Sequence, residues 1–171
     1  MRILVVYASK HGATRGIAER ITQTFQRLGM EAESHVAGAV TNLQTSSAVV
    51  IGSALYYGSW MKGAMAFVRH HHALLAQRPV WRFSSGPLGV GVNDNEPQPK
   101  ELGELQQTLK PRDHHIFFGA LDPDTLSVME RMVIKGVHAP VGDYRDWNEV
   151  EAWAASIVHA LAPTGATPSQ M

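Results

Sequence analysis

The chain has 171 residues, of which 44% are hydrophobic and 18% are charged, so it can bury a substantial core and is neither intrinsically disordered nor collagen-like. Its 15 basic and 15 acidic side chains cancel, and this balance gives no indication of nucleic-acid binding. Cysteine is absent, which excludes disulfides, thiol nucleophiles, iron–sulfur clusters and zinc-finger sites. Any redox chemistry would therefore require a bound organic cofactor.

The neutral total hides an uneven distribution of charge. Residues 1–82 carry nine basic and three acidic side chains, which leaves six basic and twelve acidic ones for the rest of the chain. An anionic ligand is therefore expected near the N-terminal half. The first apolar run is too short for a signal peptide, and none approaches the ~20 residues of a membrane span. We expect a cytoplasmic protein without an integral membrane segment.

Short apolar runs alternate with amphipathic stretches along the first third of the chain. Residues 3–8 are continuously apolar and rich in β-branched side chains, which is typical of a strand buried on both faces. A helix is predicted between Gly12 and Gly29, and its apolar stripe comprises Ile17, Ile21, Phe25 and Leu28. Residues 31–36 then predict a polar edge strand, and residues 48–53 a second buried strand.

The same alternation continues to the end of the chain. The elements predicted there are a helix over 61–75, a strand over 79–84, a loop over 86–99, a helix over 100–109, a strand over 116–120, a helix around 126–134, a helix over 148–161 and a disordered tail over 163–171. The first of these helices is expected to align Met61, Met65, Val68, His72 and Leu75 on one side. The last is expected to bury Val150, Trp153, Ile157 and Leu161.

Five strands alternating with helices predict an α/β fold, in which a parallel sheet has right-handed crossovers and helices on both faces. No repeat or linker interrupts the chain, so we expect one domain over residues 1–162, with residues 121–146 as a helical insertion before the last helix. Ligands of such sheets bind at the carboxyl ends of the strands, near the point where the strand order reverses. The loops after the first, third and fourth strands are therefore the candidate site.

The first of these loops joins a buried strand to a helix and reads Ser9, Lys10, His11, Gly12, Ala13 and Thr14. Unpaired backbone N–H groups and the positive end of the helix dipole stabilise a phosphate at such a position. The Ser9 and Thr14 hydroxyls can donate further hydrogen bonds, and Gly12 allows close approach of the backbone. The loop matches neither a Walker A motif nor a dinucleotide-binding fingerprint. The alternative is an ordinary turn in which Ser9 and Thr14 cap the helix.

The second loop, residues 52–60, contains three aromatic side chains among five residues. Tyr56, Tyr57 and Trp60 follow the predicted end of a strand, where aromatic rings suit stacking on a flat ligand. Alternatively, Tyr56 or Trp60 covers the edge of the sheet. The third loop, Ser84, Ser85, Gly86, Pro87, Leu88 and Gly89, consists mainly of small residues that let backbone amides reach a ligand.

Taken in order, these loops resemble those of the flavodoxin-like FMN-binding family. Its phosphate motif is similar to the pattern formed by Ser9, His11, Gly12 and Thr14. The chain resembles in particular the branch that contains menaquinone-dependent protoporphyrinogen IX dehydrogenases. The segments that carry this resemblance are Leu55-Tyr56-Tyr57-Gly58, Phe118-Gly119-Ala120-Leu121 and Asp146-Trp147. Unlike a polybasic membrane-binding insertion, however, residues 121–146 hold five acidic and three basic side chains.

This resemblance implies a three-layer sandwich with strand order 2-1-3-4-5 and a noncovalently bound FMN. Its phosphate would lie in the first loop and its ring between the second and third, with Tyr57 stacked on the ring and Tyr56 or Trp60 at its margin. The cofactor-binding residues so implied are Ser9, Lys10, His11, Gly12, Ala13, Thr14, Ser53, Ala54, Leu55, Tyr56, Tyr57, Gly58, Ser84, Ser85, Gly86, Pro87, Leu88 and Gly89. No dedicated acid–base residue and no metal site is predicted, because consecutive helical residues such as His70, His71 and His72 point in different directions.

Two main functional hypotheses follow. One is an FMN-dependent oxidoreductase acting on a quinone-like or protoporphyrinogen-like molecule, with a small-molecule substrate or a quinone acceptor as its partner. The other is an electron carrier that docks on redox partner proteins. The balanced charge favours the enzyme, because carriers of this family are typically strongly acidic. An interaction domain without a flavin is a third hypothesis, and homo-oligomerisation stays open.

Overall fold

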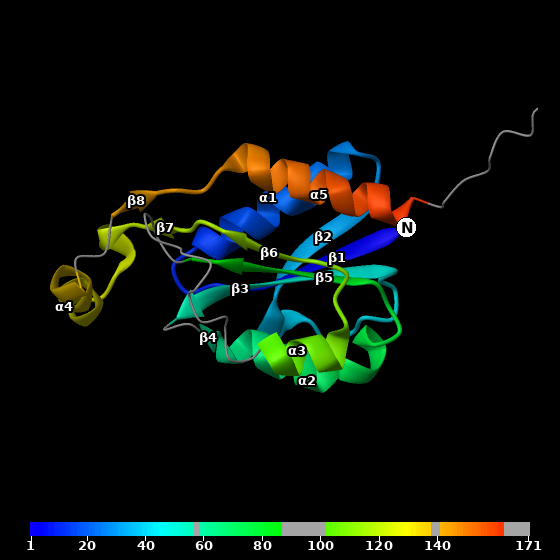
Figure 1. Cartoon of the computed structure of the whole chain (residues 1–171), viewed down its shortest axis with the longest axis horizontal. Helices are drawn as coiled ribbons and strands as arrows, with labels where there is room; N and C mark the ends of the chain where they lie inside the picture. The colour runs from blue at the N-terminus through cyan, green and yellow to red at the C-terminus, as the bar shows by residue number, and fades with distance from the viewer. Residues whose placement is uncertain (57–58, 87–101, 138–140, 163–171) are drawn as a thin grey trace, which may run out of the picture.

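The computed structural model describes residues 1–56, 59–86, 102–137 and 141–162, apart from the side chains of Tyr56, Leu102 and Val137. A twisted sheet lies between two layers of helices, with α1 and α5 on one face and α2 and α3 on the other (Figure 1). Residues 163–171, for which a disordered tail is predicted, lie outside the described residues.

Five strands of the main sheet run parallel within the described residues. Their bounds are β1 (Arg2–Ala8), β2 (Glu31–Val36), β3 (Ala48–Tyr56), β5 (Val80–Ser85) and β6 (His114–Phe117). The strand order β2-β1-β3-β5-β6 confirms the order 2-1-3-4-5, and β4 (Ser59–Trp60) pairs antiparallel with the end of β3. The strand order reverses between β1 and β3, so the carboxyl ends of these two parallel strands form the crevice in which doubly wound folds bind ligands.

Strand β1 is apolar from Ile3 to Ala8, and both of its faces are covered. Ile3 and Val5 pack in one core, and Leu4 and Val6 pack in the other. The register aligns Leu4 with Val49 of β3, so the two central strands present matching apolar side chains to both layers. The polar strand β2 lies at the edge, as predicted, with its residues exposed or only partly buried.

Helix α1 (Ala13–Arg27) buries Ile17, Ile21 and Phe25 against the sheet and packs beside α5 (Trp147–Leu161). Leu28, the fourth residue of the predicted stripe, is 49% exposed because it follows the helix as its C-cap, just before Gly29. Asp146 caps α5, where its carboxylate accepts hydrogen bonds from the N–H groups of Asn148 (2.9 Å) and Glu149 (3.2 Å).

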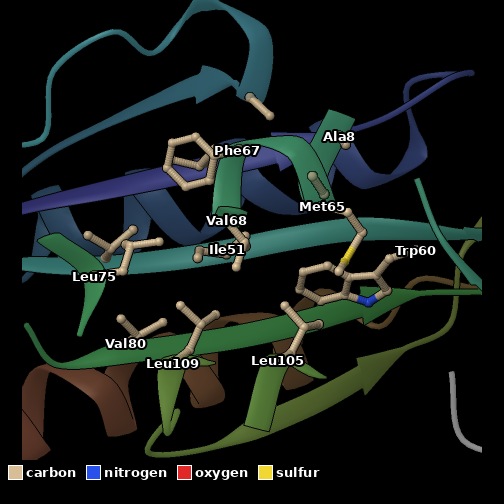
Figure 2. Packing of buried hydrophobic residues seen from close by; sticks show 14 of the residues in the cluster. Ala8, Ile51, Trp60, Met65, Phe67, Val68, Leu75, Val80, Leu105 and Leu109 are labelled. Atoms are coloured by element: carbon tan, nitrogen blue, oxygen red, sulfur yellow. The ribbon is translucent and has the colours of Figure 1, made fainter. Parts of the chain in front are cut away.

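The opposite face is covered by α2 (Lys62–Leu75) and α3 (Leu102–Leu109), whose apolar side chains form the core in Figure 2. The prediction that His72 lies on the buried side of α2 is wrong by one position. His71 is buried and contacts the Phe67 ring at 4.8 Å, whereas His72 is exposed and bonds its Nδ1 to the Arg69 carbonyl. Phe67 is buried, and His71, four residues later, lies on the same face of the helix.

The predicted insertion leaves the sheet after β6. It begins with β7 (Ala120–Leu121) and the short η2 (Pro123–Thr125), continues into α4 (Val128–Val137), and returns through β8 (Gly142–Asp143), which pairs with β7. Figure 1 shows α4 beyond the end of the sheet, separate from the two helical layers. Among the described residues, no helix is long and apolar enough to cross a membrane.

Candidate functional site

A cleft of about 800 Å³ lies at the carboxyl ends of the parallel strands, between the first loop and α4. All six residues from Ser9 to Thr14 line it. The ends of β3 and β5 contribute Ala54 and Leu55, and Ser85 and Gly86. The structure therefore brings together parts of all three loops that the sequence indicates. The volume is in the range typical of small-molecule sites.

Among the members of the implied cofactor set whose side chains the structure describes, Ser53 and Ser84 do not line the cleft. Ser53 is fully buried, and its Oγ accepts a hydrogen bond from the Met61 N–H at 2.9 Å, which ties the end of β3 to the start of α2. Ser84 is also fully buried, and its Oγ accepts a hydrogen bond from Trp60 Nε1 at 2.8 Å. Both hydroxyls hold the supporting strands together.

The second loop is shorter than the sequence suggests. Strand β3 extends to Tyr56, so Ser53, Ala54 and Leu55 belong to the strand rather than to a loop. The expectation that Trp60 borders a flat ligand is wrong, because its ring is 4% exposed and packs in the core (Figure 2). The predicted residues Tyr57, Gly58, Pro87, Leu88 and Gly89, and the side chain of Tyr56, lie outside the described residues.

The first loop turns sharply into α1. Gly12 is the N-cap residue and has φ 90°, a left-handed conformation that suits glycine, and its N–H donates to Ser9 Oγ at 3.1 Å. The first hydrogen bond of the helix runs from the Gly16 N–H to the Gly12 carbonyl, so the N–H groups of the first turn have no partner within the helix. This end of α1 can therefore stabilise an anion.

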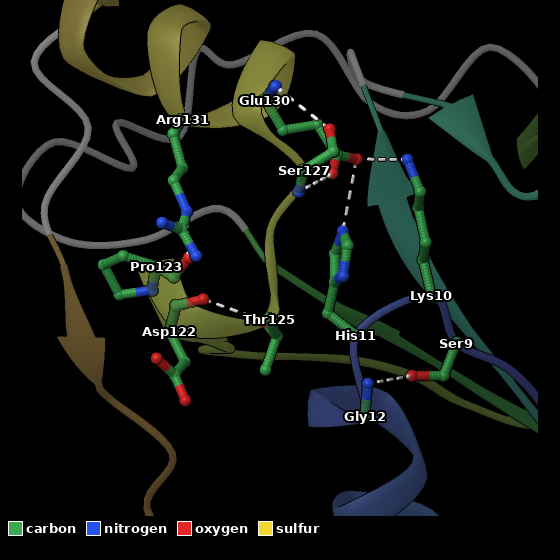
Figure 3. A network of polar contacts seen from close by, with 10 residues as sticks. All are labelled: Ser9, Lys10, His11, Gly12, Asp122, Pro123, Thr125, Ser127, Glu130 and Arg131. Atoms are coloured by element: carbon green, nitrogen blue, oxygen red, sulfur yellow. Dashed lines mark hydrogen bonds and ion pairs between the residues drawn. The ribbon is translucent and has the colours of Figure 1, made fainter.

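A carboxylate from the insertion lies over this loop (Figure 3). Glu130 Oε1 contacts both Lys10 Nζ and His11 Nε2, the latter at 3.3 Å. The Ser127 N–H donates to Glu130 Oε2 at 2.9 Å, and the Glu130 N–H donates to Ser127 Oγ, which is the reciprocal arrangement of a capping box. The hydrogen bonds from Lys10, and next those from Ser127, lower the pKa of Glu130 to about 2.

Glu130 is the main site residue that sequence reasoning missed. The sequence does contain a signal for its local role, because a serine three residues before a glutamate at a helix start is typical of a capping box. Nothing local indicates that the same carboxylate reaches Lys10, which lies 120 residues earlier in the chain.

The ends of β5 and β6 approach each other closely beside the cleft. Gly86 has φ 112°, and its N–H donates to the Phe117 carbonyl at 3.0 Å. A Cβ atom on Gly119 would lie 3.3 Å from Ser85 Oγ and 3.5 Å from the Gly86 nitrogen. Glycine at these positions keeps the two strand ends together and leaves backbone groups facing the cleft.

The wall opposite the first loop is mostly apolar and comes from the insertion. Its apolar members are Leu121, Leu126, Met129, Val133 and Ile134. Arg145, which also lines the cleft, is held by Asp143, with Nη2–Oδ2 at 2.6 Å and Nε–Oδ1 at 2.8 Å. No cluster of three or more metal-ligating side chains occurs among the residues that the structure describes.

The sequence model of the flavodoxin domain matches residues 4–148. The chain belongs to the flavodoxin domain family. Its fold is similar to a flavodoxin from the domain Archaea (TM-score 0.65, 16% identity, 94% of this chain and 99% of that one). It is also similar to oxidised flavodoxin 1 from Bacillus cereus (TM-score 0.64, 13% identity, 95% and 100%). An Escherichia coli (strain K12) protein named protoporphyrinogen IX dehydrogenase (quinone) is 23% identical over 173 residues, which cover 93% of this chain and 96% of that protein.

The flavodoxin fold implies a flavin cofactor and a redox role, and the residues present fit such a group. The first loop already holds an anionic group, the Glu130 carboxylate, beside the N-terminus of α1. The cleft continues from this anion-binding end to the apolar wall of the insertion. A phosphate at one end and a flat ring system at the other would each meet matching chemistry.

Proposed function

We propose that the protein is an FMN-dependent oxidoreductase that acts on a small molecule with an apolar ring system, either quinone-like or protoporphyrinogen-like. The observation that carries the proposal is the composition of the cleft. One end is a helix N-terminus with Lys10 and His11, and the other is the apolar wall formed by α4 and the segments beside it. A cofactor phosphate matches the first end, and an apolar substrate matches the second.

The residues that would hold FMN are those of the first loop and the strand ends. Unpaired N–H groups at the start of α1 and the Lys10 ammonium would bind the phosphate. The backbone around Leu55, Ser85 and Gly86 would contact the ring, and Tyr57 stays our choice for stacking on it. When bound, the flavin would supply the ability to accept and pass on hydride or single electrons.

The described residues of the cleft would contribute mainly positioning. The titratable side chains described around the cleft are engaged with one another or with nearby backbone: Lys10 and His11 with Glu130, Arg145 with Asp143, and Asp122 with the Asp124 N–H. The apolar side chains of the insertion would orient the substrate and exclude water from the cleft.

The substrate class is also supported by the relative in Escherichia coli, whose name includes protoporphyrinogen IX and a quinone. Both molecules have apolar ring systems, although protoporphyrinogen IX also carries two propionate groups, and such rings fit a wall formed by Leu126, Met129 and Val133. The electron-carrier hypothesis is supported instead by the full-length similarity to flavodoxins.

Titration of the purified protein with FMN, followed by absorbance and flavin fluorescence, tests the cofactor. Turnover of protoporphyrinogen, and of a soluble quinone with reduced flavin, tests the enzyme. Val133→Asp places a charge on the cleft wall, whereas Met132→Asp places one on an exposed part of α4 that does not line the cleft. We expect KM to rise at least tenfold in V133D and to stay within twofold in M132D.

Two results would overturn the proposal. A protein that does not bind FMN removes the cofactor on which the proposal rests. Turnover no faster than that of free FMN, with tight FMN binding, would favour the electron carrier.

A further inference from the structure

The loop that would receive the cofactor phosphate already binds a carboxylate of its own chain. We infer that Glu130 controls occupancy of the phosphate subsite, because its carboxylate and a phosphate compete for the same cationic loop. This inference rests on the proposed function, since it concerns the same site. It makes α4 a segment that cofactor loading must displace.

The competition follows from where the Glu130 carboxylate lies. One oxygen, Oε1, contacts both Lys10 Nζ and His11 Nε2, on the two residues that precede the N-cap Gly12 (Figure 3). A phosphate bound by the first turn of α1 would draw on the Lys10 ammonium and lie beside His11 Nε2, which is where the Glu130 carboxylate lies. A carboxylate and a phosphate dianion in contact repel each other, so both cannot bind this loop in that way.

The second oxygen ties the carboxylate to α4 itself. Glu130 Oε2 accepts the Ser127 N–H at 2.9 Å, which caps the helix. The carboxylate therefore cannot leave Lys10 and His11 by side-chain rotation alone without giving up this cap. Either the cap is lost or the start of α4 moves with the carboxylate, and in both cases the helix is affected.

Helix α4 is held loosely enough to move. None of its described side chains belongs to the buried core, and Val128, Met129 and Met132 are 74%, 77% and 67% exposed. Arg131 donates to the Pro123 carbonyl at 2.7 Å, a contact within the insertion itself. The ion pairs of Glu130 are thus a principal polar link between α4 and the first loop.

The charge of Glu130 can be removed while its role as a helix cap is kept. Glutamine also forms a capping box, so Glu130→Gln retains an acceptor for the Ser127 N–H and removes the negative charge beside Lys10. Glu104→Gln is the matched control, because Glu104 of α3 pairs with Arg69 of α2 at 2.8 Å, and neither residue lines the cleft. Comparing the two variants separates the local competition from a general change in charge.

The experiment compares FMN, riboflavin and inorganic phosphate as ligands by fluorescence titration or calorimetry. We expect E130Q to bind FMN and inorganic phosphate about 5- to 50-fold more tightly than the unaltered protein, a range typical of coupled sites. Riboflavin has no phosphate, so its affinity should change less than twofold. E104Q should behave like the unaltered protein with all three ligands.

Unchanged or weaker FMN and phosphate binding in E130Q would overturn the inference, as would an equal gain for riboflavin. If no flavin binds at all, the proposed function fails, but the phosphate comparison still tests Glu130. Amide hydrogen exchange gives an independent readout. Inorganic phosphate should speed exchange in α4 of the unaltered protein and leave α4 of E130Q unchanged, whereas slower exchange in the unaltered protein would contradict the competition.

Discussion

Arg82 is a buried cation with few partners, and replacing it should stabilise the protein. The side chain lies in β5 and is 5% exposed, yet its Nε and Nη1 atoms have no hydrogen-bond partner among the described residues. Only Nη2 has one, a long contact of 3.4 Å to Gln106 Oε1. Burial lowers the pKa of the guanidinium, which reflects the cost of keeping this charge out of water. We therefore predict that Arg82→Met raises stability.

The magnitude follows from the atoms left unpaired. A buried donor without a partner costs about 1–3 kcal/mol, and more when it is charged. Methionine replaces most of the apolar stem of the arginine, but it does not fill the space that the guanidinium occupies. The resulting cavity offsets part of the gain in stability. We expect a net increase of about 1–2 kcal/mol in the free energy of unfolding. For a chain of this size that corresponds to a rise of about 2–8 °C in Tm.

Calorimetry and urea denaturation at pH 7 measure this change directly. Arg112→Met is the matched control, because Arg112 is exposed and its guanidinium lies over the Trp81 ring at 5.2 Å. Removing that contact should lower the free energy of unfolding by about 0.5–1 kcal/mol. A fall in Tm of several degrees in R82M would refute the reasoning, because it would mean that the guanidinium is well compensated where it lies.

Two further predictions concern the side chains bonded to Ser84 Oγ, which are His114 Nε2 at 3.0 Å and Trp60 Nε1 at 2.8 Å. Burial, and next the charge of Arg82, lower the pKa of His114 to about 4, so the unfolded chain binds more protons between pH 6.5 and 4. The free energy of unfolding therefore carries no penalty from His114 above about pH 6.5, and it should fall by up to about 3 kcal/mol as the pH drops to 4. In urea denaturation, His114→Gln should show a flatter dependence of this free energy on pH. An unchanged pH dependence would contradict the assignment. Trp60→Phe removes the Nε1 donor to Ser84 at 2.8 Å and should cost about 1–3 kcal/mol in the same assay; a cost below ~0.5 kcal/mol would show that this bond is dispensable.

The central strands were predictable because a strand buried on both faces is a continuous run of apolar residues, which is visible in the sequence itself. Residues 3–8 and 48–53 are apolar on both faces, and both segments are central strands of the sheet. Ile17, Ile21 and Phe25 likewise locate the buried face of α1, because regular spacing depends only on the helix itself. The strand order came from family resemblance, since local pattern does not specify which strands pair.

Features that depend on distant contacts could not be predicted in this way. Trp60 is in the core, where its indole N–H donates to Ser84, and no local pattern indicates this contact between residues 24 positions apart. The position of Glu130 depends on how the whole insertion returns over the first loop. Sequence reasoning therefore indicated that the first loop borders the cleft, as it does, and missed the residue that lies over that loop.

The uneven charge of the chain has a structural counterpart in the cleft. Lys10 and His11 belong to the basic N-terminal half, and Glu130 belongs to the acidic C-terminal half. The helix that carries Glu130 also supplies Met129 and Val133 to the apolar wall. If displacement of α4 admits the phosphate, it also reshapes the surface proposed for the substrate. Coupling between two binding sites is reciprocal. A substrate that binds better with α4 displaced must therefore raise the affinity for FMN by the same factor by which bound FMN raises the affinity for that substrate.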